Sequence, residues 1–111
     1  MPTPPAPVPA LAVFHDTAAQ RYEARRGDQT VVGHLDYEKG ADGAWILAHT
    51  IVPPAHAGQG VASFLARAVL GDARDHGRQV VPACSFVAAW LQRHPDYLPL
   101  VQPAARQRMG L

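Results

Sequence analysis

The sequence predicts an α/β (α+β) fold in which an antiparallel meander leads into a β-α-β unit and then a second short helix. Polarity alternates with period two through residues 11–52, and a helical apolar stripe follows from residue 61. A short strand and another helix come after that stripe. The length of 111 residues leaves room for one compact domain.

The first half of the chain predicts four strands separated by turns rich in Gly and Asp. The strands are expected at residues 11–15, 20–26, 30–37 and 44–52. Alternation places Tyr22 and Ala24 on one face of the second strand, and Val31, Leu35 and Tyr37 on one face of the third. The fourth strand is apolar on both faces, which is typical of a central strand covered on both sides.

A helix is expected over residues 59–76, because apolar side chains there recur at helical spacing. These are Val61, Phe64, Leu65, Ala68 and Val69. Gly77 is suited to a left-handed cap at the end of this helix. With the strands at 44–52 and 79–83, the helix forms a β-α-β unit whose two strands should be parallel.

The strand at 79–83 carries Pro82, so we expect it to pair fully on one side at most. A second helix is expected from about residue 86 to 94, with Ser85 as candidate N-cap, and residues 97–101 suggest one more short strand.

The domain should span residues 11–102. Residues 1–10 hold five of the eleven prolines and predict an extended, flexible arm, and we expect residues 103–111 to fray as a C-terminal tail.

The composition excludes several classes of protein. Ten basic against nine acidic residues give a net charge of +1, which argues against a non-specific nucleic-acid binder. Apolar stretches are far shorter than the roughly 20 residues that span a membrane. A single Cys forbids an internal disulfide, and no signal peptide is readable, so we expect a cytoplasmic protein. The six His and one Cys show no paired spacing of metal ligands, so no metal is predicted.

Two glycines stand where the central strand passes into the long helix, in the run His56-Ala57-Gly58-Gln59-Gly60-Val61-Ala62. Backbone N–H groups in a first helical turn have no partner within the helix, and the helix dipole adds partial positive charge there. Gly58 and Gly60 leave those donors open to an anion such as a pyrophosphate. A plain glycine-rich turn is the alternative. The dinucleotide fingerprint and the P-loop are both excluded, because their further residues are absent.

These residues resemble the acyl-CoA-binding segment of the GNAT N-acetyltransferase superfamily. The motif is Gly58-x-Gly60-x-Ala62 after Val52-Pro53-Pro54, and Pro82-x-Cys84-x-Phe86-Val87 with Arg93-His94-Pro95-x-Tyr97 is similar to its small, single-domain branch. The superfamily motif often opens with Arg or Gln, where this chain has Ala57. The chain also lacks the helices that larger relatives place between their first strands.

The resemblance implies a minimal GNAT-like fold that binds acetyl-CoA or coenzyme A between the splayed strands at 44–52 and 79–83. The pantetheine amides would pair with backbone at Ile51 and Val52. The implied cofactor-binding residues are Ile51, Val52, Pro53, Gly58, Gln59, Gly60, Val61, Ala62, Ser63, Phe86, Arg93, His94 and Tyr97. The partners would be acetyl-CoA and an amine substrate, with neither nucleic acid nor membrane.

Two residues are candidates for catalysis. Cys84 lies at a helix start, where a thiol pKa is lowered, and could act as nucleophile, general acid or pocket wall. Strand alternation places His49 on the face of Trp45, Leu47 and Ile51, where it could take a proton from an amine or simply be a core histidine. The expected function is an acetyl-CoA-dependent N-acetyltransferase acting on an amine acceptor. A CoA-binding module without turnover, and a structural domain, are the alternatives.

Overall fold

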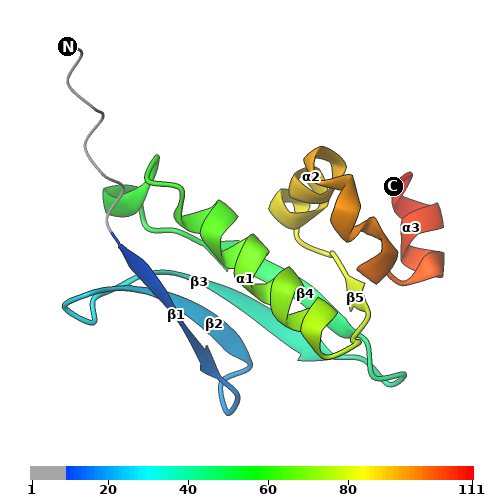
Figure 1. Ribbon diagram of the computed structural model, residues 1–111, viewed down its shortest axis with the longest axis horizontal. Helices are drawn as coiled ribbons and strands as arrows, with labels where there is room; N and C mark the ends of the chain where they lie inside the picture. The colour runs from blue at the N-terminus through cyan, green and yellow to red at the C-terminus, as the bar shows by residue number, and fades with distance from the viewer. Residues whose placement is uncertain (1–9) are drawn as a thin grey trace.

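The computed structural model describes residues 10–111, and the predicted arm lies, except for residue 10, outside them. Within this range the strands form one sheet of five, in the order β1-β2-β3-β4-β5 (Figure 1). The strands are β1 (Leu11–Asp16), β2 (Arg21–Arg26), β3 (Val31–Lys39), β4 (Trp45–Ile51) and β5 (Val80–Val81). The first four pair as antiparallel neighbours, whereas β4 and β5 are parallel, so the predicted meander and β-α-β unit are confirmed.

The helices lie on one side of the sheet (Figure 1). They are the 3-10 helix η1 (Pro54–His56), α1 (Val61–Asp75), α2 (Ser85–Arg93), the 3-10 helix η2 (Pro95–Leu100) and α3 (Pro103–Met109). Helix α1 lies across β1, β2 and β3, while α2 packs beside α1 and contacts β4. Gly77 has a φ of 62° and caps the end of α1 as expected. Within residues 10–111 we find no helix with both the length and the hydrophobicity of a membrane-spanning segment.

One continuous core joins the sheet to both long helices. Its fully buried side chains include Leu35 and Leu47 from the sheet, Leu65 and Leu70 from α1, and Trp90 from α2. The buried side of α1 is rotated from the predicted stripe. Ala66, Leu70 and Ala73 are buried, whereas Phe64 and Ala68 are only partly covered.

Two register shifts change which side chains share a face. In β3, Val32 is an extra residue between the pairs Ala24–Gly33 and Arg25–Val31. Because a bulge inverts the alternation beyond it, Val32 is fully buried and Val31 is 39% exposed. The prediction that Val31 shares a face with Leu35 and Tyr37 is therefore wrong.

The second shift lies in β4, where Ala48 is extra between the pairs Tyr37–Leu47 and Asp36–His49. Beyond it His49 and Ile51 point to the sheet face opposite the helices, and Ile51 is 48% exposed. The expectation that both faces of β4 are covered is wrong for this half of the strand. We call this surface the open face and define it by Arg21, Glu23, Arg25, His34, Asp36, His49 and Ile51.

The C-terminal segment is more ordered than the sequence suggests. Residues 95–100 form η2 in place of a strand, since Pro95 and Pro99 lack the N–H groups that a ladder needs. Only Val101 bridges to the sheet, at Val80. The expected fraying of residues 103–111 is also wrong, because α3 begins with a proline at its first turn and buries Ala105 in the core.

Candidate functional site

The junction between β4 and α1 has the backbone that an anion site needs. Gly58 and Gly60 have φ values of 78° and 76°, in the left-handed region that side chains disfavour. A Cβ atom on either glycine would meet nothing within 4 Å, so backbone conformation rather than crowding requires glycine here. Gly60 is the N-cap of α1, and its carbonyl accepts the first helical hydrogen bond, from the Phe64 amide at 3.0 Å.

The amides that follow Gly60 are available to a ligand. The first turn of a helix leaves its N–H groups without helical partners, and no side chain caps α1. No acidic residue lies in this first turn to offset the helix dipole. The amides of Val61, Ala62 and Ser63 therefore present donors and partial positive charge at one point.

A cavity of about 280 Å³ lies directly in front of these donors. It is lined by Val52, His56, Ala57, Gly58, Gly60, Val61, Ala62, Ser63 and Phe86. Seven of these are predicted cofactor-binding residues, and they come from the end of β4, the glycine junction, the start of α1 and the start of α2. Pockets that hold a whole drug-sized ligand have volumes of roughly 300–1,000 Å³. The volume of this cavity is below that range, so it would hold one part of a larger ligand.

Alongside the cavity, β4 and β5 separate. They pair at Trp45–Val80 and Ile46–Val81, and Pro82 then follows without an N–H to donate. One more hydrogen bond joins the two segments, from the Cys84 amide to the Leu47 carbonyl at 2.8 Å. Beyond Leu47, within residues 10–111, no strand pairs with β4 on this side.

Cys84 is the N-cap of α2, and a hydrogen bond of 3.4 Å joins its Sγ to Thr50 Oγ1. Burial raises the pKa of the half-buried thiol. Hydrogen bonds that the Thr50 hydroxyl and the backbone at Phe86 and Val87 donate to the thiolate together lower the pKa by a larger amount. The net pKa is below the ordinary value. Cys84, and not Ser85, occupies the N-cap position, and its surroundings raise the thiolate fraction above that of an ordinary cysteine.

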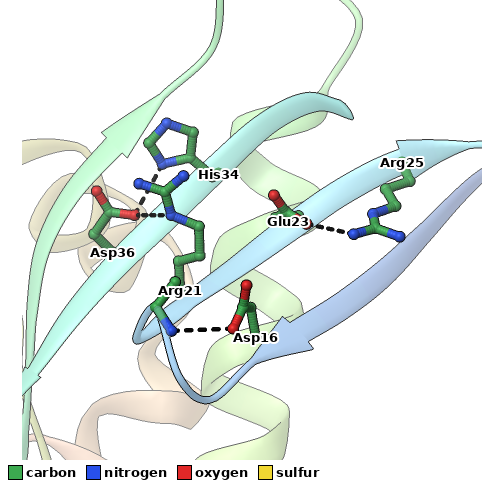
Figure 2. A network of polar contacts seen from close by, with 7 residues as sticks. Asp16, Arg21, Glu23, Arg25, His34 and Asp36 are labelled. Carbon is green, nitrogen blue, oxygen red and sulfur yellow. Dashed lines mark hydrogen bonds and ion pairs between the residues drawn. The ribbon is translucent and has the colours of Figure 1, made fainter. Parts of the chain in front are cut away.

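His49 lies on the opposite side of β4 from Cys84. Because Ala48 is bulged, His49 pairs with Asp36 on the open face, and Thr50 pairs with Leu35 on the helix side. The prediction that His49 shares a face with Trp45 and Leu47 is therefore wrong. Figure 2 shows the neighbouring polar groups, where Asp36 Oδ1 accepts from Arg21 at 3.0 Å and from His34 at 2.9 Å.

The structure does not bring Arg93, His94 and Tyr97 to the cavity. They follow the far end of α2, about 12 Å along its axis from its start. His94 stacks on Trp90 with ring centroids 3.8 Å apart, and Arg74 lies 5.1 Å over the ring of Tyr97. Ile51, Pro53 and Gln59 also fall outside the lining residues. The cofactor contacts expected of these six residues stay predictions.

Sequence reasoning missed Arg26, the last residue of β2. Its Nη2 lies 3.0 Å from Nδ1 of His56, a lining residue of the cavity. The topology could have indicated this contact, because β2 and β4 run in the same direction in the antiparallel meander and their C-terminal ends lie at the same end of the sheet. Alternation alone does not show that this side chain reaches across β3.

Comparisons with known proteins agree with this architecture. A model of the GCN5-related N-acetyl-transferase family matches residues 21–100, which is more than half of the chain. The solution structure of a GCN5-like protein from Staphylococcus aureus shares the fold, with a TM-score of 0.63 and 22% sequence identity over 83% of this chain and 88% of that one. No curated protein matches. The chain belongs to the GCN5-related N-acetyltransferase family, and the predicted enzyme class and GNAT-like fold are thereby confirmed.

Proposed function

We propose that the chain is an acetyl-CoA-dependent N-acetyltransferase that acts on an amine acceptor. The observation that carries this proposal is the uncapped start of α1, which opens onto the cavity between β4 and α2. Family membership supports acetyl transfer in general, and the junction supports a carrier with a diphosphate.

The residues at the junction fit such a group. Three consecutive amides point from the start of α1, and no carboxylate lies among the lining residues to repel an anion. Gly58 and Gly60 adopt positive φ values that favour glycine, and because glycine has no side chain, neither residue places one near these donors. A diphosphate would bind at the amides of Val61, Ala62 and Ser63.

The unpaired edge of β4 continues the site toward Cys84. Backbone groups near Ile51 and Val52 would hold the amides of the pantetheine arm, as a strand holds an extended peptide. Acetyl-CoA supplies an acetyl group that is activated as a thioester. The chain contributes binding and orientation, which remove much of the entropic barrier to transfer.

Cys84 and His49 would act from the two faces of β4. A lowered pKa raises the thiolate fraction of Cys84. For this residue the role of nucleophile is therefore favoured over the role of general acid. His49 is exposed on the open face, where it would take a proton from an approaching amine. The carrier and the acceptor would therefore reach the acetyl group from opposite sides.

Binding of coenzyme A to two variants of Gly60 tests the proposal. Gly60→Asn and Gly60→Asp have nearly the same shape, so the difference between them measures charge at the junction. In titration calorimetry we expect Gly60→Asp to bind CoA at least tenfold more weakly than Gly60→Asn. A tenfold difference in Kd corresponds to about 1.4 kcal/mol of binding free energy. Gly43→Asp is the control, because Gly43 has a similar φ of 86° and also has open space around it.

Equal affinity of the two Gly60 variants would overturn the diphosphate assignment. Turnover is measured separately, by mass spectrometry of a polyamine and of a lysine peptide incubated with acetyl-CoA. Transfer to either acceptor supports the enzyme. Tight binding of CoA without any transfer would favour a CoA-binding module in its place.

A further inference from the structure

The lining of the cavity contains no permanently charged side chain. Its nine residues are apolar or small, apart from His56 and Ser63. The run from Ala57 to Ser63 also contains no Lys or Arg. A diphosphate carries more charge than the dipole of one helix offsets, since that dipole amounts to roughly half an elementary charge. A cation from elsewhere in the fold would complete the site.

Arg26 is placed to supply that charge. Its guanidinium reaches His56 from the end of β2, with 3.0 Å between Nη2 and Nδ1. Within residues 10–111 no carboxylate forms an ion pair with Arg26, and its buried Nε has no hydrogen-bond partner. The adjacent Arg25 also has a buried Nε without a partner, but it differs in its ion pair with Glu23, at 2.6 Å on the open face. Among the described residues Arg26 therefore has no ion-pair partner, and the exposed Asp28 carboxylate interacts with its charge only from a longer distance.

The contact with Arg26 also decides how His56 presents its ring. A guanidinium stays protonated and has only donors, so Nδ1 of His56 must be the acceptor. A neutral imidazole then carries its proton on Nε2. Arg26 thus holds His56 with one N–H free to donate, and His56 is part of the cavity lining.

We infer that Arg26 is a positioning residue for the diphosphate of the acyl carrier: it orients His56 as a donor and supplies the cation that the junction lacks. This inference rests on the proposed function, and it adds a residue from β2 to a site otherwise built by β4, α1 and α2. The phosphates of CoA should depend on Arg26, and the pantetheine arm should not.

The test compares CoA with pantetheine, which has no phosphate. We expect Arg26→Gln to weaken CoA binding about tenfold in titration calorimetry, as loss of a charged hydrogen-bonding group does, and to leave pantetheine binding unchanged. Arg26→Lys should restore part of the affinity, because it keeps the charge. In turnover, the KM for acetyl-CoA should rise at constant kcat. Arg25→Gln is the matched control and should bind CoA like the wild type.

Each outcome decides one claim. If the wild type binds CoA and Arg26→Gln binds it equally well, the role of Arg26 is wrong and the proposed function stands. A parallel loss of CoA and pantetheine affinity would make Arg26 merely structural and would also overturn the inference. If the wild type binds no CoA, the proposed function fails first. Should Arg26→Gln not fold, His56→Phe replaces it, with the same selective loss of CoA affinity expected.

Discussion

Gly33 in β3 lies directly beneath Val61, the first residue of α1. A Cβ atom at Gly33 would lie 2.7 Å from Cγ1 of Val61 and 3.1 Å from the carbonyl oxygen of Ile51. The first distance is too short for a Cβ atom unless Val61 moves, and the second is tighter than ordinary van der Waals contact. The missing side chain at Gly33 therefore sets how closely the start of α1 approaches the sheet, and with it the position of the anion-binding amides.

Gly33→Ala should consequently disturb both stability and binding. Overpacking of a tight core position costs about 1–3 kcal/mol, and here the strain would displace Val61. We expect a lower free energy of unfolding in urea and weaker CoA binding. Gly27→Ala is the control, since a Cβ at Gly27 meets nothing within 4 Å. Unchanged stability of Gly33→Ala would show that the helix start moves freely.

Thr50→Val should raise the pKa of the Cys84 thiol. The Thr50 hydroxyl lies 3.4 Å from Sγ and is one cause of the lowered pKa, so its removal leaves burial less opposed. The pH dependence of iodoacetamide alkylation measures this change, because Cys84 is the only cysteine of the chain. The profile should move to higher pH in Thr50→Val and stay in place in Thr17→Val, an exposed turn position. Coincident profiles would contradict the assigned hydrogen bond.

His49→Gln should slow acetyl transfer without weakening CoA binding. A positioned general base contributes about 10²–10⁴-fold, so we expect kcat/KM to fall at least 100-fold. His34→Gln is a suitable control, because His34 lies on the same open face and is hydrogen-bonded to Asp36. A similar loss in both variants, or none in either, would remove His49 from the proposed mechanism.

His15 should make the protein less stable in mild acid. Burial is the largest cause that lowers its pKa in the folded state, and the nearby Asp72 only partly opposes it. As the pH falls, the unfolded chain therefore binds a proton on His15 before the folded chain does. The free energy of unfolding is unaffected by His15 above pH 6.5, the ordinary pKa of histidine, and declines as the pH falls below that value. His15→Gln should show a smaller decline in urea unfolding between pH 7.5 and 5.5, whereas the exposed His76→Gln should follow the wild type.

Much of the fold was predictable, since alternation and helical spacing report burial directly. The strands, the two longer helices and the parallel pairing of β4 with β5 follow from such patterns. The bulges at Val32 and Ala48 do not, because an extra residue is defined by the partner strand and not by its own neighbours. This is why alternation alone predicts the wrong face for Val31 and His49.

Some residues of the candidate site were likewise predictable from the sequence, and others were not. Glycines at a helix start carry a local signal, and seven predicted residues do line the cavity. Arg26 carries no such signal, because its contact with His56 depends on how far a side chain reaches across the sheet. Helix α3 is also not predicted by apolar periodicity, since it is short and Ala105 is its one fully buried residue.

The most direct test of the account follows backbone amides by NMR while CoA is added to the isotope-labelled protein. The largest shifts should fall on the amides of Gly60, Val61, Ala62 and Ser63, and pantetheine should leave these four nearly unmoved, because it lacks the anion they bind. If the largest shifts fall elsewhere, or if pantetheine moves these amides as far as CoA does, the start of α1 is not where the diphosphate binds.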